Sequence, residues 1–309
     1  MKKLLIIDGN HLVHRAYHAY PQNFTSPDGR PVGMVYGWCV MFLKALEIIK
    51  PTHVAICFDR PAPTFRKTMY AGYQANRPQM ESELSDQIVF LQEALTQSGF
   101  PQFGVDGYEA DDLIGTLALQ AEEAYTDGDE TIILSGDRDL LQLVDKYTKE
   151  MMPLTGITNF QLLDPQGVKE KMGVGPEQIV DYKALVGDAS DGYPGITGIG
   201  PKTAITLLEK YATFERVYEH LDEISPRVVE KLTEFAEQGA MSKKLAQIVC
   251  DAPVHLRWDE VALSNIEEAT IASVFEELGF SSLARKMRLF AAPKPEKKPK
   301  VNEHQLSLL

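Results

Sequence analysis

Cysteine is scarce in this 309-residue chain. The three cysteines, Cys39, Cys57 and Cys250, lie in apolar surroundings and lack the spacing of a metal site. The sequence therefore excludes a disulfide framework and a thiolate zinc site as organising features. A reducing interior suits free thiols of this kind.

Long apolar runs are also missing. No segment is apolar over the roughly 20 residues that a membrane-spanning helix needs. The apolar start of the chain, residues 4–7, is interrupted by Asp8 too early for a signal peptide. We therefore expect a globular, cytoplasmic protein without a membrane partner.

Basic residues are outnumbered, with 31 Lys and Arg against 44 Asp and Glu and a formal net charge of -13 at pH 7. Taken alone, this balance argues against a nucleic-acid partner. A cluster of acids that binds metal ions would itself add negative charge, so the net charge does not exclude a nucleic-acid partner. The hydrophobic content of 44% and the length allow one large or two modest globular domains.

Acidic residues follow several short apolar runs. Asp8 follows residues 4–7, Asp59 follows residues 54–58, and Asp137 and Asp139 follow residues 131–136. Such runs, separated by helical segments, predict parallel strands of an α/β sheet. Because sites in open sheets form beyond the carboxyl ends of the strands, we expect these acids to converge. A single aspartate after a strand is otherwise typical of a cap or turn.

Three further acids, Glu109, Asp111 and Asp112, open a segment whose apolar residues then recur at helical spacing. Acids are common at a helix start for electrostatic reasons alone. Together with the strand-end acids, however, they would repel one another strongly unless cations neutralised them. Oxygen ligands without thiolate or imidazole favour Mg²⁺ or Mn²⁺. A zinc face made by His11, His14 and His18 is the alternative, but no Glu or Cys completes its ligand set.

Residues 60–80 form a basic segment that contains no acid. Its basic residues are Arg60, Arg66, Lys67 and Arg77, and its interleaved aromatics include Phe65, Tyr70 and Tyr73. Basic side chains neutralise phosphates, and exposed aromatics stack on unpaired bases. A solvated loop with inward aromatics is the alternative. Because the segment directly follows Asp59, we interpret it as a substrate gate.

From about Pro165 the pattern becomes helical and rich in glycine. Asp188 and Asp191 precede a turn at residues 195–204 that predicts a hairpin between two helices. Pro201 suits the first position of the second helix, whose free N–H groups, with Lys202 beside them, can hold a backbone phosphate. The spacing is not that of a P-loop.

The last residues form a linker rich in proline and lysine, which predicts disorder. It ends in Gln305-Leu306-Ser307-Leu308-Leu309, an aliphatic cluster that suggests a partner-binding motif. A frayed end without function is the alternative.

Taken together, these motifs resemble those of the 5′ nuclease (flap endonuclease) family, and are most similar to the 5′→3′ exonuclease domains of bacterial DNA polymerase I. The resemblance runs from Met1 to about Phe290. The segments that carry it are Ile7-Asp8-Gly9-Asn10, Phe58-Asp59, Phe65-Arg66-Lys67, Gly72-Tyr73-Gln74-Ala75-Asn76-Arg77, Gly107-Tyr108-Glu109-Ala110-Asp111-Asp112, Asp137-Arg138-Asp139, Gly187-Asp188-Ala189-Ser190-Asp191 and the hairpin at 195–204.

The resemblance implies an α/β fold with a PIN-like catalytic domain and a central, mainly parallel sheet at residues 1–165. Residues 60–80 would form a basic arch, residues 166–290 a helix-hairpin-helix DNA-binding domain, and residues 291–309 a disordered tail.

The resemblance also implies two-metal phosphodiester hydrolysis. Ligands of the first metal would be Asp8, Asp59, Glu109 and Asp111, and the acids around the second Asp112, Asp137, Asp139, Asp188 and Asp191. Arg77, with Arg66 and Lys67, would grip the scissile phosphate, and Tyr73 would stack on the adjacent base. Further DNA contacts would come from Arg60, Tyr70, Gln74, Gly195, Gly198, Gly200, Lys202 and Thr203, with a K⁺ ion at the hairpin.

By the same resemblance, the substrate is DNA with a 5′ flap, nick or single-strand/duplex junction, RNA-primed ends included, and the protein is a nucleoid-associated monomer. The tail is similar to motifs that dock on the sliding clamp. Two positions depart from the family pattern, since Gln74 replaces the usual lysine and Gly192 the usual asparagine. All nine acids are present, so we predict an active enzyme rather than a non-catalytic junction binder. A PIN-type ribonuclease, the other alternative, would lack the hairpin and the arch.

Overall fold

A six-stranded sheet forms the centre of the computed structural model, which describes residues 1–21, 23–76, 80–156 and 158–291. The strand order is β3-β2-β1-β4-β5-β6. The strands are β1 (Lys3–Asp8), β2 (His53–Cys57), β3 (Gln102–Phe103), β4 (Glu130–Leu134), β5 (Thr148–Pro153) and β6 (Phe160–Leu163). All neighbours pair in parallel except β5 and β6, which form an antiparallel hairpin. The predicted mainly parallel α/β sheet is confirmed.

The central strand β1 is apolar because both of its faces are covered. Leu5 and Ile7 belong to one hydrophobic core, and Leu4 and Ile6 to the core on the opposite face. In register, Asp8 lies opposite Cys57 of β2, and Ile7 lies opposite Leu134 of β4. The acids that follow these strands therefore emerge at one edge of the sheet.

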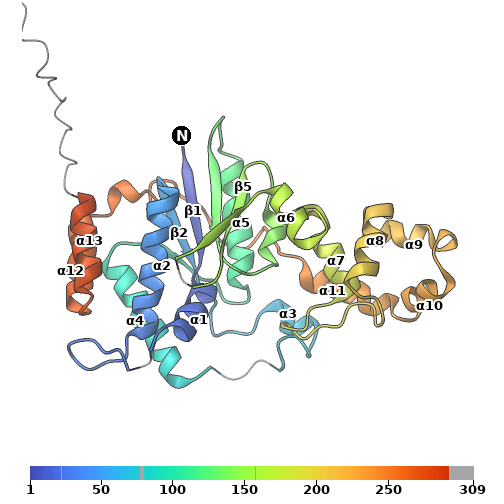
Figure 1. Cartoon of the computed structure of the whole chain (residues 1–309), viewed down its shortest axis with the longest axis horizontal. Coiled ribbons are helices and arrows are strands. Elements are labelled where there is room, and N and C mark those ends of the chain that lie inside the picture. The colour runs from blue at the N-terminus through green and yellow to red at the C-terminus, as the bar shows by residue number, and fades with distance from the viewer. Residues whose placement is uncertain (22, 77–79, 157, 292–309) are drawn as a thin grey trace, which may run out of the picture.

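Helices cover both faces of the sheet (Figure 1). One face carries α1 (Gly9–Ala19), α2 (Gly33–Ile49) and α4 (Ser82–Gln97), whose apolar residues share the core that includes Leu5 and Ile7. The other face carries α5 (Ala110–Glu122), which packs on Leu4 and Ile6.

A second group of helices lies beside the sheet and has its own core (Figure 1). Its members are α6 (Pro165–Met172), α7 (Ile179–Val186), α8 (Pro201–Tyr211), α9 (Phe214–Glu219) and α10 (Pro226–Glu234), with α11 (Ala236–Ala246) packed against α7. Short 3-10 turns are η1 (Leu140–Leu143), η2 (Pro176–Gln178), η3 (Leu221–Glu223) and η4 (Leu263–Asn265).

The predicted hairpin joins α7 to α8. Gly198 has a φ of +89°, a conformation that favours glycine, while Ile199 is buried and Pro201 opens α8. The turn is therefore built as the sequence predicted.

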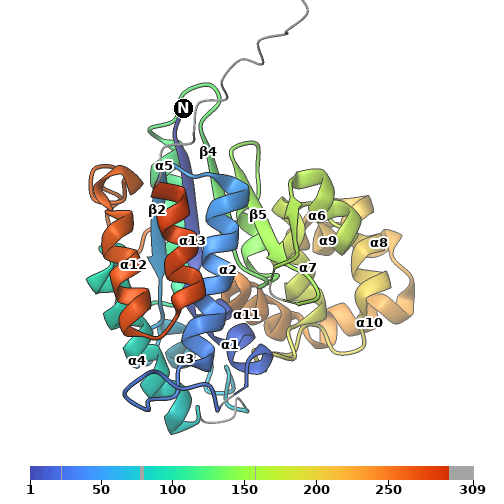
Figure 2. The same ribbon diagram turned by 60° about the vertical axis from the view of Figure 1, so that its left-hand side comes forward.

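The chain then returns to the sheet. Helices α12 (Glu268–Glu277) and α13 (Ser281–Ala291) pack beside α2 and α4, as Figure 2 shows, and Ile271, Phe275 and Phe280 join the core of that face. This differs from the predicted second domain at 166–290, because the apolar faces of these two helices are buried against the first part of the chain. Among the described residues, no helix is long and apolar enough to cross a membrane.

Candidate active site

A cavity of about 670 Å³ lies beyond the carboxyl edge of the sheet. Six of the predicted acids line it, namely Asp8, Asp59, Glu109, Asp111, Asp137 and Asp191. They come from the ends of β1, β2 and β4, from the start of α5 and from the loop after α7. The convergence predicted from the sequence is therefore present in the fold.

Asp8 is buried at the end of β1 and caps α1. Its Oδ1 accepts a hydrogen bond from the His11 N–H at 2.9 Å, and its Oδ2 accepts one from the Ser135 hydroxyl at 2.7 Å. Burial raises the pKa of Asp8 to about 7, although these hydrogen bonds oppose the shift. The carboxyl group is held in one orientation at the floor of the cavity.

The start of α5 is tied to the end of β2. The N–H of Ala110 donates to Asp59 Oδ1 at 2.7 Å, which places Asp111 in the cavity between strands. Burial raises the pKa of Asp111 well above its ordinary value, and the charges of Asp137, Asp8 and further acids raise it more. Crowded carboxyls of this kind are stabilised when divalent cations bind among them, so the donor set fits hard metal ions.

A second group of acids lies at one side of the cavity. Asp139, Asp188 and Asp191 can each place a carboxylate oxygen within 4.8 Å of the others. This trio is the metal-type grouping found in the described part of the chain, and it contains no histidine. The zinc alternative built on His11, His14 and His18 therefore has no support in the geometry.

Sequence reasoning missed Lys183, the basic residue of this second group. The Lys183 ammonium forms ion pairs with Asp139 and, at 2.5 Å, with Asp188. Burial acts to raise the pKa of Asp188, but the charge and hydrogen bond of Lys183 outweigh it and lower that pKa. The ion pair with Asp139 joins a lysine of α7 to an aspartate in the loop after β4, and no sequence spacing predicts such a contact. The sequence therefore carried no signal for the role of Lys183.

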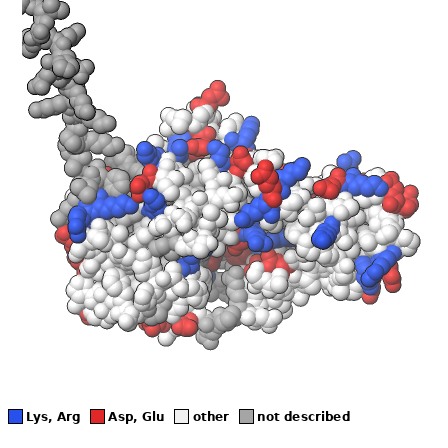
Figure 3. All heavy atoms as spheres, viewed as in Figure 1, with Lys and Arg blue, Asp and Glu red and all other residues white. Residues whose placement is uncertain are grey.

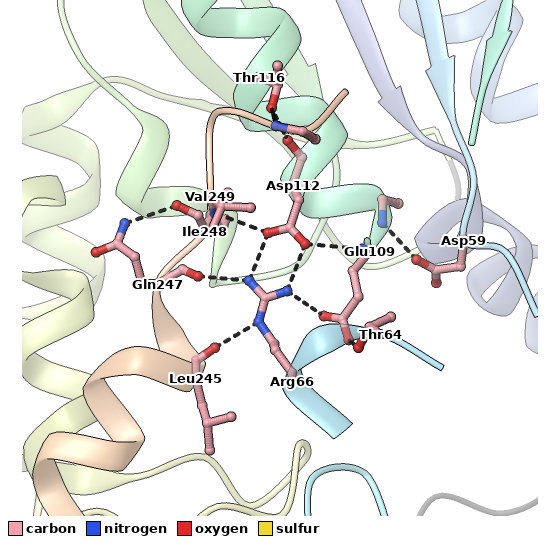
Figure 4. A network of polar contacts seen from close by, with 12 residues as sticks. Asp59, Thr64, Arg66, Glu109, Asp112, Thr116, Leu245, Gln247, Ile248 and Val249 are labelled. Atoms are coloured by element: carbon pink, nitrogen blue, oxygen red, sulfur yellow. Dashed lines mark hydrogen bonds and ion pairs between the residues drawn. The ribbon is translucent and has the colours of Figure 1, made fainter. Parts of the chain in front are cut away.

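Arg66 does not face the cavity, which corrects its predicted role in gripping the phosphate. Arg66 belongs to α3 (Phe65–Met69) and is only 2% exposed, and its side chain lies against the start of α5 and the segment after α11 (Figure 4). Two N–H groups donate to the carboxylate of Asp112 at 2.8 Å each, and others donate to the carbonyls of Leu245 and Gln247. Its donors are directed to protein groups, so its role is structural.

Asp112 is the buried partner of this arginine and is therefore not placed as a metal ligand, contrary to prediction. Its side chain is fully buried, and both oxygens accept from Arg66. The N–H groups of Glu109 and Val249 also donate to it, at 3.1 Å each (Figure 4). Binding a metal there would require breaking this buried ion pair.

Tyr73 is inside the protein, which corrects its predicted role as a stacking platform for a base. It is 4% exposed, and its ring lies 6.3 Å from that of Tyr193 between centroids. Its hydroxyl donates to Glu109 at 2.9 Å and to Asp191 at 3.3 Å. Tyr73 therefore joins the two groups of acids.

The two departures from the family pattern are neighbours in space. Gln74 donates its backbone N–H to the Asp191 carbonyl at 2.7 Å and its side-chain amide to the Asp191 carboxylate at 3.1 Å. Gly192 has a φ of +73°, and a Cβ there would lie 3.0 Å from the carbonyl oxygen of Gly72. The segment from Gly72 to Gln74 is thus packed on the loop that carries Asp191.

We expect Gly192→Ala to destabilise the protein more than Gly29→Ala does. Both glycines have positive φ, so each alanine costs about 1–2 kcal/mol, but only at Gly192 would the Cβ meet another backbone. Urea unfolding of the two variants measures the difference. Hydrogen exchange at the Gln74 amide should also accelerate in Gly192→Ala alone. Equal destabilisation and unchanged exchange would contradict the packing of Gly72 and Gln74 on this loop.

The remaining predicted DNA contacts divide into two sets. Arg60 and Lys67 are exposed and line the acid cavity, while Tyr70 is half-buried. At the hairpin, Gly195 packs against Gly187, Gly198 makes the turn, Gly200 precedes α8, Lys202 is exposed and Thr203 is half-buried. Arg77 and the terminal Gln305, Leu306, Ser307, Leu308 and Leu309 lie outside the described residues.

A buried acid that the sequence did not reveal lies in β5, next to β4. Glu150, in the middle of β5, is fully buried, and neither carboxyl oxygen has a hydrogen-bond partner among the described residues. Burial raises its pKa well above 4.5, and the charges of Asp137 and Asp8 add to the shift. A raised pKa means that the folded state binds more protons than the unfolded one, so stability falls as pH rises above the ordinary value.

We therefore expect Glu150→Gln to stabilise the protein at alkaline pH. Keeping a carboxyl protonated costs about 1.4 kcal/mol for each pH unit above its ordinary pKa. The gain in unfolding free energy should therefore be small near pH 5 and grow by up to about 1.4 kcal/mol for each further pH unit. Urea unfolding at pH 5 and at pH 8 measures it, with the exposed Glu209→Gln as control. A gain that does not depend on pH would contradict the burial of a neutral acid.

Two family models match consecutive parts of the chain. The first, described as 5′-3′ exonuclease, N-terminal resolvase-like domain, matches residues 3–173. The second, described as 5′-3′ exonuclease, C-terminal SAM fold, matches residues 174–269. Their order agrees with an α/β part followed by a helical hairpin part.

Curated relatives agree with these models. DNA polymerase I of Bacillus subtilis (strain 168) is 40% identical over 287 residues, which cover 93% of this chain and 32% of that protein. DNA polymerase I of Bacillus caldotenax is 41% identical over the same shares. The chain thus spans about a third of the length of these relatives.

Solved structures share the fold. A bacteriophage T5 D15 flap endonuclease, in a pseudo-enzyme–product complex with DNA and metal ions, has a TM-score of 0.66 at 17% identity, covering 94% of this chain and 99% of that one. The catalytic core of Rad2 in complex with DNA substrate has a TM-score of 0.60 at 13% identity, covering 94% and 92%. With both family models matched and relatives about 40% identical across most of its length, the chain belongs to the 5′-3′ exonuclease family.

Proposed function

We propose that this chain hydrolyses DNA phosphodiester bonds near a 5′ end, as a divalent-metal-dependent 5′→3′ exonuclease and flap endonuclease. The observation that carries the proposal is the cavity in which acids from three strand ends, the start of α5 and the loop after α7 meet, with Arg60 and Lys67 also lining it. Family membership and the DNA complexes of T5 D15 and Rad2 support it.

We assign eight of the acids to two Mg²⁺ ions, or to Mn²⁺ in their place. The first would be held by Asp8, Asp59, Glu109 and Asp111, and the second by Asp137, Asp139, Asp188 and Asp191. Asp112 is left out because Arg66 occupies it. When bound, such cations lower the pKa of a water and stabilise charge on the attacking and leaving oxygens.

The basic residues of the chain would position the substrate. Lys67 and Arg60, exposed at the cavity, would attract the phosphates of a 5′ strand, and Arg77 would join them. The free N–H groups at the start of α8, with Lys202 beside them, would hold the backbone of the downstream duplex, where a K⁺ ion would also bind. These contacts read no base sequence, so selectivity would come from the shape of the junction.

The proposed substrates are 5′ flaps, nicks and single-strand/duplex junctions, RNA-primed ends included, and we propose a cytoplasmic, nucleoid-associated monomer. The test is a duplex with a 5′-labelled flap, incubated with Mg²⁺ or with EDTA. We expect a short labelled product with Mg²⁺ alone. Binding without cleavage would favour the non-catalytic junction binder, and cleavage of single-stranded RNA in preference to the flap would favour a PIN-type ribonuclease.

We also propose that residues 305–309 bind a sliding clamp, from the aliphatic motif in the sequence. Deleting these five residues should abolish clamp binding in surface plasmon resonance while leaving flap cleavage unchanged. A variant with the same five residues in scrambled order is the matched control. Unchanged affinity after deletion would rule out the motif.

A further inference from the structure

Lys183 lies in α7 with its ammonium group inside the second group of acids. Its side chain is only 7% exposed. A buried ammonium is costly unless it is paired, and here two carboxylates pair with it. These are Asp139, which follows β4, and Asp188, which follows α7.

The ammonium of Lys183 lies where the surrounding carboxylates would attract a metal cation. Asp139, Asp188 and Asp191 form the trio whose oxygens approach one another within 4.8 Å, and Lys183 contacts two of its three members. The third, Asp191, instead accepts hydrogen bonds from Tyr73 and Gln74. Three carboxylates at this separation repel one another, and a single positive charge offsets part of that repulsion.

The structure also gives the lysine room to move. A cavity of about 500 Å³ is lined by Lys183 and by Asp188 of the trio, with Arg138 and Tyr182 among its other residues. Basic and acidic side chains lie close together on the face near α6 and α7, as Figure 3 shows. A lysine side chain, with its flexible stem, can turn into this space while keeping its charge in contact with water.

We infer that Lys183 is a positioning residue whose ammonium serves as the counter-ion of the second group of acids. Its ammonium holds Asp139 and Asp188 together when no divalent ion is bound, and it weakens the binding of that ion by competing for the same two carboxylates. The inference rests on the proposed function, because it takes the trio as part of a metal centre.

The test uses the full-length protein without DNA and measures Mn²⁺ binding by isothermal titration calorimetry. The variants are Lys183→Met, which removes the charge at similar length, and Lys183→Arg, which keeps it. We expect Lys183→Met to bind the weaker of two Mn²⁺ ions about tenfold more tightly or better, because one competing charge at contact distance is gone. Lys183→Arg should stay close to wild type.

A second measurement separates competition from a change in folding. In EDTA, Lys183→Met should melt at a lower temperature than wild type, because the carboxylates lose their counter-ion. In saturating Mg²⁺ the two melting temperatures should converge. Lys169→Met, an exposed lysine on α6, is the control for the change in net charge and should alter neither measurement.

Each outcome decides the matter. Wild type that binds Mn²⁺, together with Lys183→Met that binds it no more tightly, overturns the inference and leaves the proposed function standing. A lower melting temperature that persists in Mg²⁺, without tighter binding, shows a purely structural lysine and also overturns it. Wild type that binds no Mn²⁺ at all overturns both the inference and the proposed function.

Discussion

Asp111→Asn is expected to lower the rate of flap cleavage by about a thousandfold or more while leaving DNA binding in EDTA intact. Asp111 lies among Asp8, Asp59 and Asp137, and burial together with their charges raises its pKa. An amide keeps the shape of the carboxylate but contributes no negative charge to a bound cation. Metal-assisted charge stabilisation is worth several kcal/mol, and each 1.36 kcal/mol is about tenfold in rate.

The same substitution should stabilise the protein when no metal is present. Removing one of several carboxyls that repel one another reduces the electrostatic repulsion that raises the pKa values of the others. The melting temperature in EDTA should therefore rise, whereas stabilisation by added Mg²⁺ should shrink. Single-turnover cleavage and thermal unfolding measure the two effects, with the exposed Asp106→Asn as control. Near-normal cleavage by Asp111→Asn would refute the proposed metal centre.

Arg66→Met is expected to lower the free energy of unfolding by about 3–5 kcal/mol. The arginine is the buried partner of Asp112 and also contacts Glu109 at 3.2 Å. Removing one partner of a buried pair leaves the other charge buried and uncompensated, which costs about this much. Leu245 and Gln247 would also lose the donor to their carbonyl groups.

Urea unfolding measures this effect, and a double variant shows its cause. Arg66→Met with Asp112→Leu removes both charges and should recover much of the lost stability, as replacement of a buried pair by apolar groups often does. Arg257→Met breaks a surface pair with Glu260, whose side chains are 68% and 56% exposed, and should change little. A small loss in Arg66→Met itself would contradict the structural role of Arg66.

The sequence predicted the sheet and most of the acid cluster because both depend on local patterns. Apolar runs of β-branched and aliphatic residues end in Asp8 and Asp59, and parallel pairing brings strand ends to one edge whatever the loops do. The helix start at Glu109 followed from acids ahead of a periodic apolar stretch. These features need no knowledge of distant contacts.

The roles of Arg66, Tyr73 and Asp112 could not be predicted in this way. Each depends on segments far away in the chain, since the carbonyls of Leu245 and Gln247 cover Arg66 only after α11 has packed. A basic or aromatic residue in a motif can either face substrate or close a buried network, and its type alone does not distinguish the two. Lys183 was missed for the same reason.

The return of α12 and α13 to the sheet has a consequence for how the protein is made. Phe275 and Phe280 are among the residues that complete the core on one face of the sheet. They are synthesised after all six strands and the hairpin. A nascent chain still lacking them displays the apolar sides of α2 and α4 to the surrounding water. This core therefore finishes folding only after α12 and α13 have left the ribosome, and chains interrupted before that point are exposed to chaperones and proteases.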